Sequence, residues 1–354
     1  MLETTPEPAA HSDITWDRIQ ALPKAELHVH LDGSLRPGTL LEMARDRGVE
    51  LPAGDPDALV DYMDASDARG LEDYLERFQV TLSVLQDEEA LERAAFEVAE
   101  DAAREAVRYM EVRFSPILHV EDGLPLAAPV DAVLRGLARA REAHGIRTAL
   151  IVCGIRNMDP GTSRDLADLT VAYKNRGVVA FDLAGAEYNY PAKKHRDAFF
   201  TVINKNMAAT IHAGEAYGPE SIHQALHYCR ANRIGHGTRL HEDPDLLRYV
   251  KNFRIPLEIC LTSNVQTGAV DGYESHPLRS YFDQSLVVTL NTDNRLISNT
   301  SLTREFWLAH TRLGFSWEEL RTLSRMSFES AFLDLEEKQA LLSRVERETD
   351  ALAT

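Results

Sequence analysis

Two histidines near the start of the chain, His28 and His30, alternate with apolar residues in the segment Ala25–Ser34. Side chains two residues apart on a β-strand point to the same face. The two imidazoles would therefore face one way, and Asp32 would join them if the strand extends that far. Two imidazoles at this spacing can bind one metal ion without a bend in the backbone. A pair of ordinary surface or core histidines is the alternative interpretation.

More polar residues follow later segments that are typical of buried strands. A single group of this kind is more often a polar residue satisfied within the core. Five groups occur at the ends of such segments, which favours a shared site: His28, His30 and Asp32; Asp182, Gly185 and Glu187; His212 and Glu215; Gly235, His236 and Gly237; and Asn291, Asp293 and Asn294.

Four of these residues suit one divalent metal ion, namely His28, His30, His212 and Asp293. Imidazole and carboxylate ligands without a thiolate fit zinc best, although iron or cobalt also accepts such a set. A metal ion with an open position lowers the pKa of its water to about 7 and supplies hydroxide at neutral pH. The sequence therefore predicts a metal-dependent hydrolytic site.

Glu215 and His236 would supply proton chemistry beside this metal. Glu215 lies three residues after His212, so its carboxyl group could act on the substrate as a general acid or base. His236 could hydrogen-bond the activated water or stabilise developing charge. Glu258, in a later strand segment, is our candidate for the residue that orients His236. A simple ion pair in the core is the alternative for Glu258.

The elements that must position these residues alternate between strand and helix. We expect eight strands, at about residues 26–30, 108–114, 148–153, 178–183, 209–212, 233–236, 256–260 and 286–291, with helical segments between them. This alternation predicts an α/β fold, a closed (β/α)8 barrel whose active site lies at the carboxyl ends of its strands. An open doubly wound sheet is the alternative, but no Gly-x-Gly-x-x-Gly motif follows the first strand.

Helical segments extend beyond the barrel alternation. The segment from residue 37 to about 85 has apolar residues at helical spacing, which predicts core packing, and part of it could instead form a lid over the pocket. The residues after the eighth strand predict a C-terminal helical extension. We expect residues 1–15 to form a flexible tail and residues 16–354 to form a single domain.

Composition argues against several classes of partner. The formal charge of −18 over 354 residues repels nucleic acid and anionic membranes. The sequence contains no apolar run of membrane-spanning length and no secretory leader pattern. Its three cysteines, Cys153, Cys229 and Cys260, form no Cys-x-x-Cys pair, which fits a reducing cytoplasm. The expected protein is cytoplasmic and binds a small molecule, with no nucleic-acid or membrane partner.

Taken together, these residues resemble the adenosine deaminase family of metal-dependent hydrolases. The resemblance covers most of the chain and rests on segments in the family's order: Glu26–Ser34, Asp182–Gly185, His212–Glu215, Arg233–Gly237, Thr262–Asn264 and Asn291–Asp293. It implies a (β/α)8 barrel with one zinc ion per subunit on His28, His30, His212 and Asp293. It also implies hydrolysis of adenosine or 2′-deoxyadenosine to inosine or 2′-deoxyinosine and ammonia.

The same resemblance implies roles for single residues. Glu215 would protonate the purine ring, and His236 would assist the water. Gly185 would offer its backbone to the purine, and Asp32 would face the ribose. His30 would line the substrate site as well as the metal site.

Two positions depart from the family pattern. Many members carry a second Asp directly after the metal-binding one, and it contacts the purine; here that residue is Asn294, whose amide can donate to a ring nitrogen or shift the preference among 6-aminopurines. Ala186 stands where an Asp commonly follows Gly185. Deaminases of adenine or aminodeoxyfutalosine share the metal set, so another aminopurine is the alternative substrate. A non-catalytic purine-binding protein is a more distant alternative.

Overall fold

The computed structural model describes residues 14–353 and contains eight parallel strands, ordered in the sheet as they occur in the chain. Each strand pairs with the next one in parallel register. The predicted (β/α)8 barrel is confirmed, and every strand boundary lies within two residues of the expected one: β1 (Lys24–His30), β2 (Val107–Phe114), β3 (Arg147–Ile155), β4 (Val178–Ala184), β5 (Ala208–Ala213), β6 (Arg233–His236), β7 (Leu257–Ile259) and β8 (Val288–Leu290).

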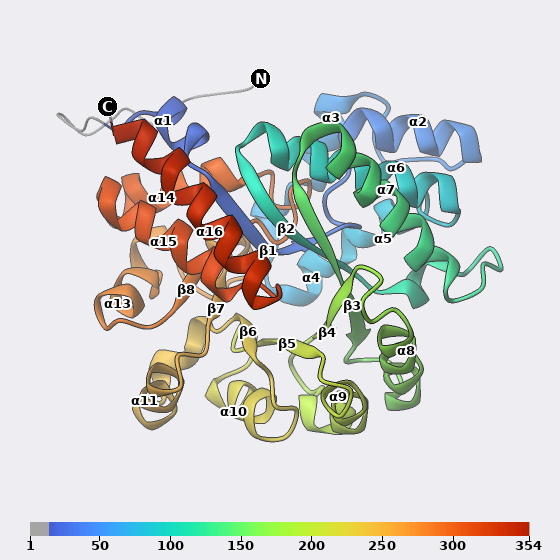
Figure 1. Ribbon diagram of the computed structural model, residues 1–354. Helices are drawn as coiled ribbons and strands as arrows, with labels where there is room; N and C mark the ends of the chain where they lie inside the picture. The colour runs from blue at the N-terminus through green and yellow to red at the C-terminus, as the bar shows by residue number, and fades with distance from the viewer. Residues whose placement is uncertain (1–13, 354) are drawn as a thin grey trace.

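Helices surround the strands (Figure 1). Two of them, α1 and α12, were not predicted. None of the helices between residues 14 and 353 has the length and apolar character needed to cross a bilayer. The helices are α1 (Trp16–Ala21), α2 (Pro37–Arg47), α3 (Pro56–Met63), α4 (Leu71–Glu76), α5 (Phe78–Leu82), α6 (Glu88–Arg104), α7 (Ala128–His144), α8 (Pro160–Ala172), α9 (Arg196–Ile203), α10 (Pro219–His227), α11 (Pro244–Asn252), α12 (Leu261–Gln266), α13 (Leu278–Asp283), α14 (Leu302–Leu313), α15 (Trp317–Ser330) and α16 (Leu335–Asp350).

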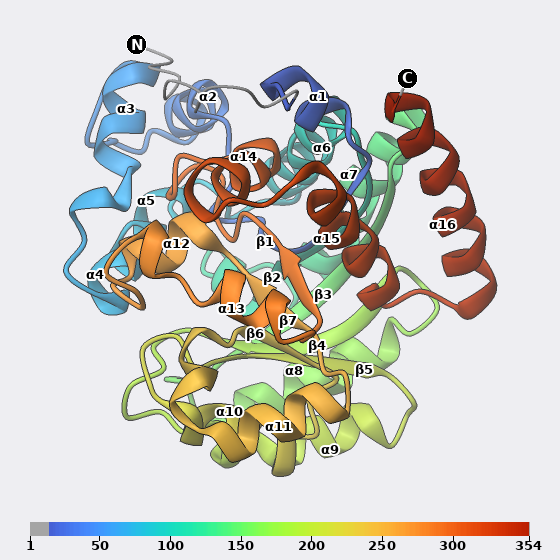
Figure 2. The ribbon, with the colours of Figure 1, turned by 90° about the vertical axis from the view of Figure 1, so that its left-hand side faces the viewer.

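The predicted helical insertions lie on two sides of the barrel. The expected helical segment after β1 forms α2 to α5, and the C-terminal extension forms α14 to α16. Figure 2 shows α4 and α16 at opposite sides of the molecule. The predicted tail falls almost wholly outside the described residues. Of its last two residues, Ile14 is buried and the Thr15 side chain caps α1.

Backbone bonds between β1 and the segment after β8 join the first and last strands. The Asp293 N–H donates to the His28 carbonyl at 3.0 Å, and the His30 N–H donates to the Asp293 carbonyl at 2.7 Å. The Asn291 side chain accepts a further bond from the Leu27 N–H at 2.8 Å. This junction places Asp293 directly beside the two histidines of β1.

Strand β2 shows how the alternation of side chains divides the core. Met110 and Val112 belong to the large apolar cluster of the protein. Glu111 and Arg113, which alternate with them, are fully buried among charged partners. A strand buried on both faces can thus serve an apolar layer on one side and an ionic centre on the other.

Gly33, in the turn after β1, packs closely against the segment after β8. Its carbonyl accepts a bond from the Leu296 N–H at 3.0 Å, and a Cβ at this position would lie 1.8 Å from Asn294 Oδ1. Gly33→Ala should therefore lower the free energy of unfolding by about 1–3 kcal/mol, because Asn294 is buried and has to move.

The matched control is Gly38→Ala in α2, where an added Cβ meets nothing within 4 Å. This control should leave stability unchanged or raise it by up to about 1 kcal/mol. Urea denaturation of both variants measures the difference. Equal midpoints for Gly33→Ala and the unmodified protein would contradict the packing argument.

Candidate active site

The groups predicted from the strand ends meet in one pocket of about 210 Å³. The pocket is lined by side chains that follow or end β1, β5, β6 and β8, together with Gly185 after β4. The carboxyl ends of the strands therefore converge as the barrel requires. The predicted residues that line the pocket are His30, Asp32, Gly185, His212, Glu215, His236, Asp293 and Asn294.

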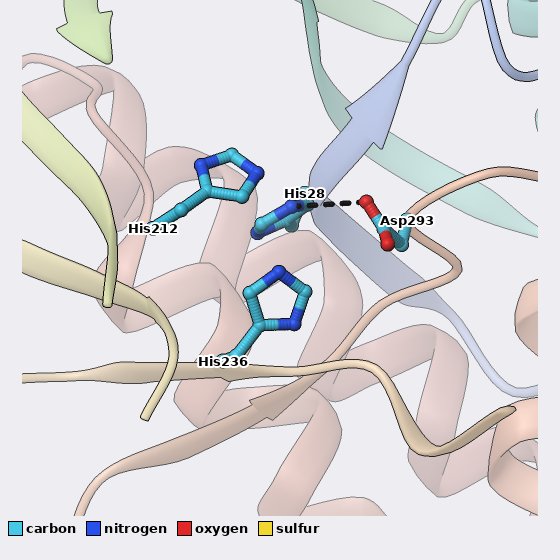
Figure 3. Close-up of side chains that lie close together, drawn as sticks. All are labelled: His28, His212, His236 and Asp293. Atoms are coloured by element: carbon cyan, nitrogen blue, oxygen red, sulfur yellow. Dashed lines mark ion pairs between the residues drawn. The ribbon is translucent and has the colours of Figure 1, made fainter. Parts of the chain in front are cut away.

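A cluster of imidazoles and one carboxylate lies at the base of this pocket. His28, His212, His236 and Asp293 each place one ligand atom within 4.8 Å of all the others (Figure 3). His30 adjoins them, with its Nε2 3.1 Å from His212 Nε2 and 3.4 Å from Asp293 Oδ1. The structure therefore brings together the four predicted metal ligands and adds His236 as a fifth neighbour.

Two buried carboxylates orient two of the imidazoles. Glu258 Oε2 lies 2.9 Å from His28 Nδ1, and Asp182 Oδ2 lies 3.1 Å from His212 Nδ1. With Nδ1 occupied in this way, the Nε2 atom of each ring is left for the centre of the cluster. Glu258 was expected to orient His236, and that prediction is wrong. Glu258 comes from β7 and faces His28.

Arg113 joins the two orienting carboxylates. Its guanidinium donates to Asp182 Oδ2 and to Glu258 Oε2, each at 2.9 Å, and all three side chains are fully buried. Burial opposes ionisation of both acids, but Arg113 and the neighbouring histidines outweigh it and lower the pKa of Asp182 and Glu258. Both carboxylates are therefore ionised at neutral pH and accept from the rings.

The protonation states of the histidines favour a bound cation. Burial lowers the pKa of His30 to about 3 and also lowers the pKa of His212 and His236, so these rings are neutral. His28 differs: burial and Arg113 lower its pKa, but Asp293 and Glu258 outweigh them and raise it. The buried His28 Nε2 lies 3.2 Å from Asp293 Oδ1. The neutral rings of His30 and His212, together with a third imidazole nitrogen beside a carboxylate, suit a metal ion.

Asp293 is fixed from both its backbone and its side chain. Its backbone lies in the left-handed region, with φ of 62°, and is bonded to β1 on either side. Ser263 in α12 donates its hydroxyl to Asp293 Oδ2 at 2.7 Å. The second oxygen, Oδ1, is left for His28 and His30, at 3.2 and 3.4 Å.

Glu215 lies in a turn that a second carboxylate holds in place. Glu187 Oε1 accepts the Gly214 N–H at 2.7 Å, and Glu187 Oε2 accepts the N–H groups of residues 215, 216 and 217 at 2.6 to 3.0 Å. Burial, and then the charges of Asp293 and Glu187, raise the pKa of Glu215 well above its usual value. The raised pKa favours the protonated form of Glu215, which is the form that a general acid needs.

The remaining predicted substrate residues line the same pocket. Asp32 is buried after β1, and its Oδ1 has no hydrogen-bond partner among the described residues. Gly185 has φ of 93°, and a Cβ there would lie 2.9 Å from Asn157 Oδ1. Asn294 donates one amide hydrogen to Tyr74 Oη at 2.9 Å. Ala186 is half-buried, while the adjacent Glu187 supplies the buried carboxylate of this segment.

Helices α4 and α5 cover the apolar side of the pocket. They contribute a row of lining side chains, Leu71, Tyr74, Leu75, Phe78 and Leu82. The Tyr74 hydroxyl also lies 2.7 Å from Ser298 Oγ, which ties α4 to the segment after β8. The segment expected to pack or to act as a lid thus forms a wall of the site. Its opening stays a prediction.

Sequence reasoning assigned no role to several residues that organise the site. Asp182 and Asn264 lie in the quoted motifs, whereas Arg113 and Glu187 carried only a weak signal. That signal is a charged residue inside, or directly after, a strand that is otherwise apolar. Such a residue must find a buried partner, but the sequence does not say which one.

Comparison with known proteins identifies the family. The family model described as adenosine deaminase matches residues 23–348. The chain belongs to the adenosine deaminase family. An adenosine deaminase of Mycobacteroides abscessus is 43% identical over 345 residues, covering 92% of this chain and 95% of that protein. A probable adenosine deaminase of Dictyostelium discoideum is also 43% identical, but the chain spans only 42% of its length.

Solved structures of two deaminases and one amidohydrolase share the barrel of this adenosine deaminase family member. An adenine deaminase from Arthrobacter aurescens superposes with a TM-score of 0.86 at 29% identity, covering 92% of this chain and 98% of that one. An amidohydrolase from Burkholderia ambifaria with bound Zn superposes with a TM-score of 0.87 at 25% identity, covering 99% of this chain and 96% of that one. The N6-mAMP deaminase of Arabidopsis superposes with a TM-score of 0.84 at 29% identity, covering 95% of this chain and 99% of that one.

The raised pKa of Glu215 predicts a pH-dependent cost in stability. The folded protein holds a proton that the unfolded chain releases above about pH 4.3, so this residue destabilises the fold increasingly as the pH rises. Glu215→Gln cannot ionise. It should raise the melting temperature at about pH 7.5, and the gain should shrink towards about pH 4.

Thermal denaturation across this pH range, after metal removal with a chelator, tests the prediction. Glu336→Gln, at an exposed position in α16, is the control and should follow the unmodified protein. A Glu215→Gln variant whose gain in melting temperature is the same at both ends of the range would show that folding does not raise the pKa of Glu215.

Proposed function

We propose that this chain hydrolyses the 6-amino group of adenosine and 2′-deoxyadenosine, giving the inosine product and ammonia. The observation that carries the proposal is that the cluster of imidazoles and Asp293 lies beside Glu215, a buried acid with a raised pKa, within one pocket. Curated adenosine deaminases that match at 43% identity over nearly their whole length support the choice of substrate.

The donor set fits zinc. His28, His30, His212 and Asp293 would hold one ion per subunit, through three imidazole nitrogens and one carboxylate oxygen without a thiolate. When bound, such an ion supplies a water molecule with a pKa near 7 as the nucleophile. The approach of His28 Nε2 and His30 Nε2 to Asp293 Oδ1 and the neutral rings of His30 and His212 support this set.

The protein's own residues would handle the protons and the substrate. Glu215 would give its proton to a ring nitrogen as the nucleophile adds at C6, so that negative charge does not build up on the purine. His236, with its Nε2 3.5 Å from Glu215 Oε2, would hydrogen-bond the oxygen at the reacting carbon. Gly185 and Asn294 would contact the purine, and Asp32 would face the ribose.

Adenosine turnover tests the proposal directly. The purified protein loaded with zinc should convert adenosine to inosine, followed by the fall in absorbance and by chromatography of the product. Glu215→Gln should lower kcat by about 10²- to 10⁴-fold, because the general acid is lost. Metal analysis should find zinc retained in this variant. A chelator should abolish turnover in the unmodified protein, and added zinc should restore it.

Glu336→Gln is again the matched control and should keep full activity. Zinc-loaded protein that leaves adenosine, deoxyadenosine and other 6-aminopurines unchanged would refute the proposal. Glu215→Gln at the unmodified rate would refute the role of Glu215 and leave the reaction itself standing.

Another aminopurine substrate is the second candidate, because solved neighbours at 29% identity include an adenine deaminase and an N6-mAMP deaminase. The buried, unpartnered Asp32 Oδ1 favours a substrate with a hydroxyl group at this point. Asp32→Asn should raise the KM for adenosine about tenfold and leave turnover of free adenine unchanged. Steady-state kinetics on both substrates measures the contrast. Preference for adenine in the unmodified protein would favour the second candidate.

The setting we propose is the cytoplasm, with a small purine nucleoside as the ligand. All three cysteines of the described chain are buried and free of disulfide bonds. That state suits a reducing compartment. The charge of −18 disfavours nucleic acid as a partner and imposes no such penalty on a neutral nucleoside.

A further inference from the structure

His236 is the one imidazole of the cluster whose Nδ1 meets an amide instead of a carboxylate. Asn264 Nδ2 lies 3.0 Å from His236 Nδ1, and Asn264 is fully buried in α12. An amide group can donate or accept, depending on which way it is turned. The direction of this one hydrogen bond decides which nitrogen of His236 carries the proton.

A backbone group settles that direction through His276. The Leu278 N–H, which can only donate, points at His276 Nδ1 at 3.0 Å. His276 Nδ1 is therefore unprotonated, and the proton of the neutral ring lies on Nε2. That Nε2 lies 3.2 Å from Asn264 Oδ1 and donates to it. The amide nitrogen of Asn264 is then left to donate to His236 Nδ1.

The reverse arrangement would place two donors face to face. If Asn264 turned its oxygen to His236, its NH₂ group would meet the N–H of His276 in a fully buried position. An unsatisfied buried donor costs about 1–3 kcal/mol, and here both partners would be unsatisfied. Burial lowers the pKa of His276 to about 3, so this ring takes no second proton at neutral pH.

We propose that the Leu278 N–H, His276 and Asn264 act as a relay that fixes His236 as the tautomer with its proton on Nε2. This inference rests on the proposed function, because it names what His236 presents to the reacting oxygen. With no lone pair on Nε2, His236 is not a metal ligand despite its place in the cluster. It is a hydrogen-bond donor aimed into the pocket, and His276 and Asn264 are positioning residues.

Histidine-selective ¹⁵N NMR tests the tautomer without any turnover. Two samples of the unmodified protein are measured, one stripped of metal and one loaded with zinc. In both, His236 Nε2 should carry the proton and His236 Nδ1 should carry none. The signal is assigned with His236→Gln. A protonated Nδ1 on His236 in the unmodified protein would overturn the inference.

Asn264→Asp inverts the relay with almost no change of shape. A carboxylate only accepts, so it should take the His276 proton on one side and draw a proton onto His236 Nδ1 on the other. We expect the Nδ1 proton in the NMR spectrum, with kcat lowered about 10²- to 10³-fold and KM changed less than about threefold. A bare Nδ1 in this variant would overturn the proposal.

The matched control is Asn232→Asp, which adds the same charge at an exposed site where the side-chain oxygen already accepts the Ala209 N–H. It should leave tautomer and kinetics unchanged. His276→Ala covers the case in which Asn264→Asp does not fold. Without His276 the amide of Asn264 can turn, so His236 should become a mixture of tautomers; a pure Nε2–H form would overturn the relay. Unmodified protein that shows the expected tautomer but no adenosine turnover would refute the proposed function alone.

Discussion

The site depends on one buried arginine. Arg113 binds the carboxylates of Asp182 and Glu258, and these in turn hold His212 and His28. Five side chains from five strands are thereby fixed relative to one another in the barrel interior. Buried charges are costly unless they are paired and fully hydrogen-bonded. Loss of Arg113 would leave Asp182 without an arginine partner and Glu258 with Arg233 alone, so His212 and His28 would be held less firmly.

The same network extends below the site. Arg233 donates to Glu258 Oε1 at 2.6 Å and also pairs with Glu111. The Arg233 Cζ atom lies 3.6 Å from the centroid of the Phe332 ring, so the guanidinium stacks on that ring. A continuous series of buried ion pairs therefore runs through the barrel interior, from the histidines of the site to the segment between α15 and α16. Asp293 lies at the end of this network nearest the histidines, and no arginine among residues 14–353 pairs with it. A metal ion is the compensating charge that this end of the network would accept.

The fold and the residues that meet in the pocket could be predicted because both leave local signals in the sequence. Strand–helix alternation predicts a barrel, and polar residues at the carboxyl ends of the strands predict that these residues share one site. The partners across the interior leave no such signal: period-two alternation tells that Glu258 faces inward but not that it reaches His28 instead of His236. Helices α1 and α12 were missed; each has only six residues, fewer than two helical turns, so its periodic signal is weak. Glu187 and Asn264 act on residues that are distant in the chain or placed by such short elements.

Asn294 illustrates how the network constrains a position that departs from the family pattern. It lies beside Asp293 in a buried pocket, and its amide donates to the Tyr74 hydroxyl of α4. A second carboxylate here would place two like charges next to each other in a site that already contains Glu215, and ionising both would be costly. The amide joins the covering helix to the rim without adding charge. It can also offer its second hydrogen to an unprotonated ring nitrogen, which fits purine recognition in an otherwise acidic pocket.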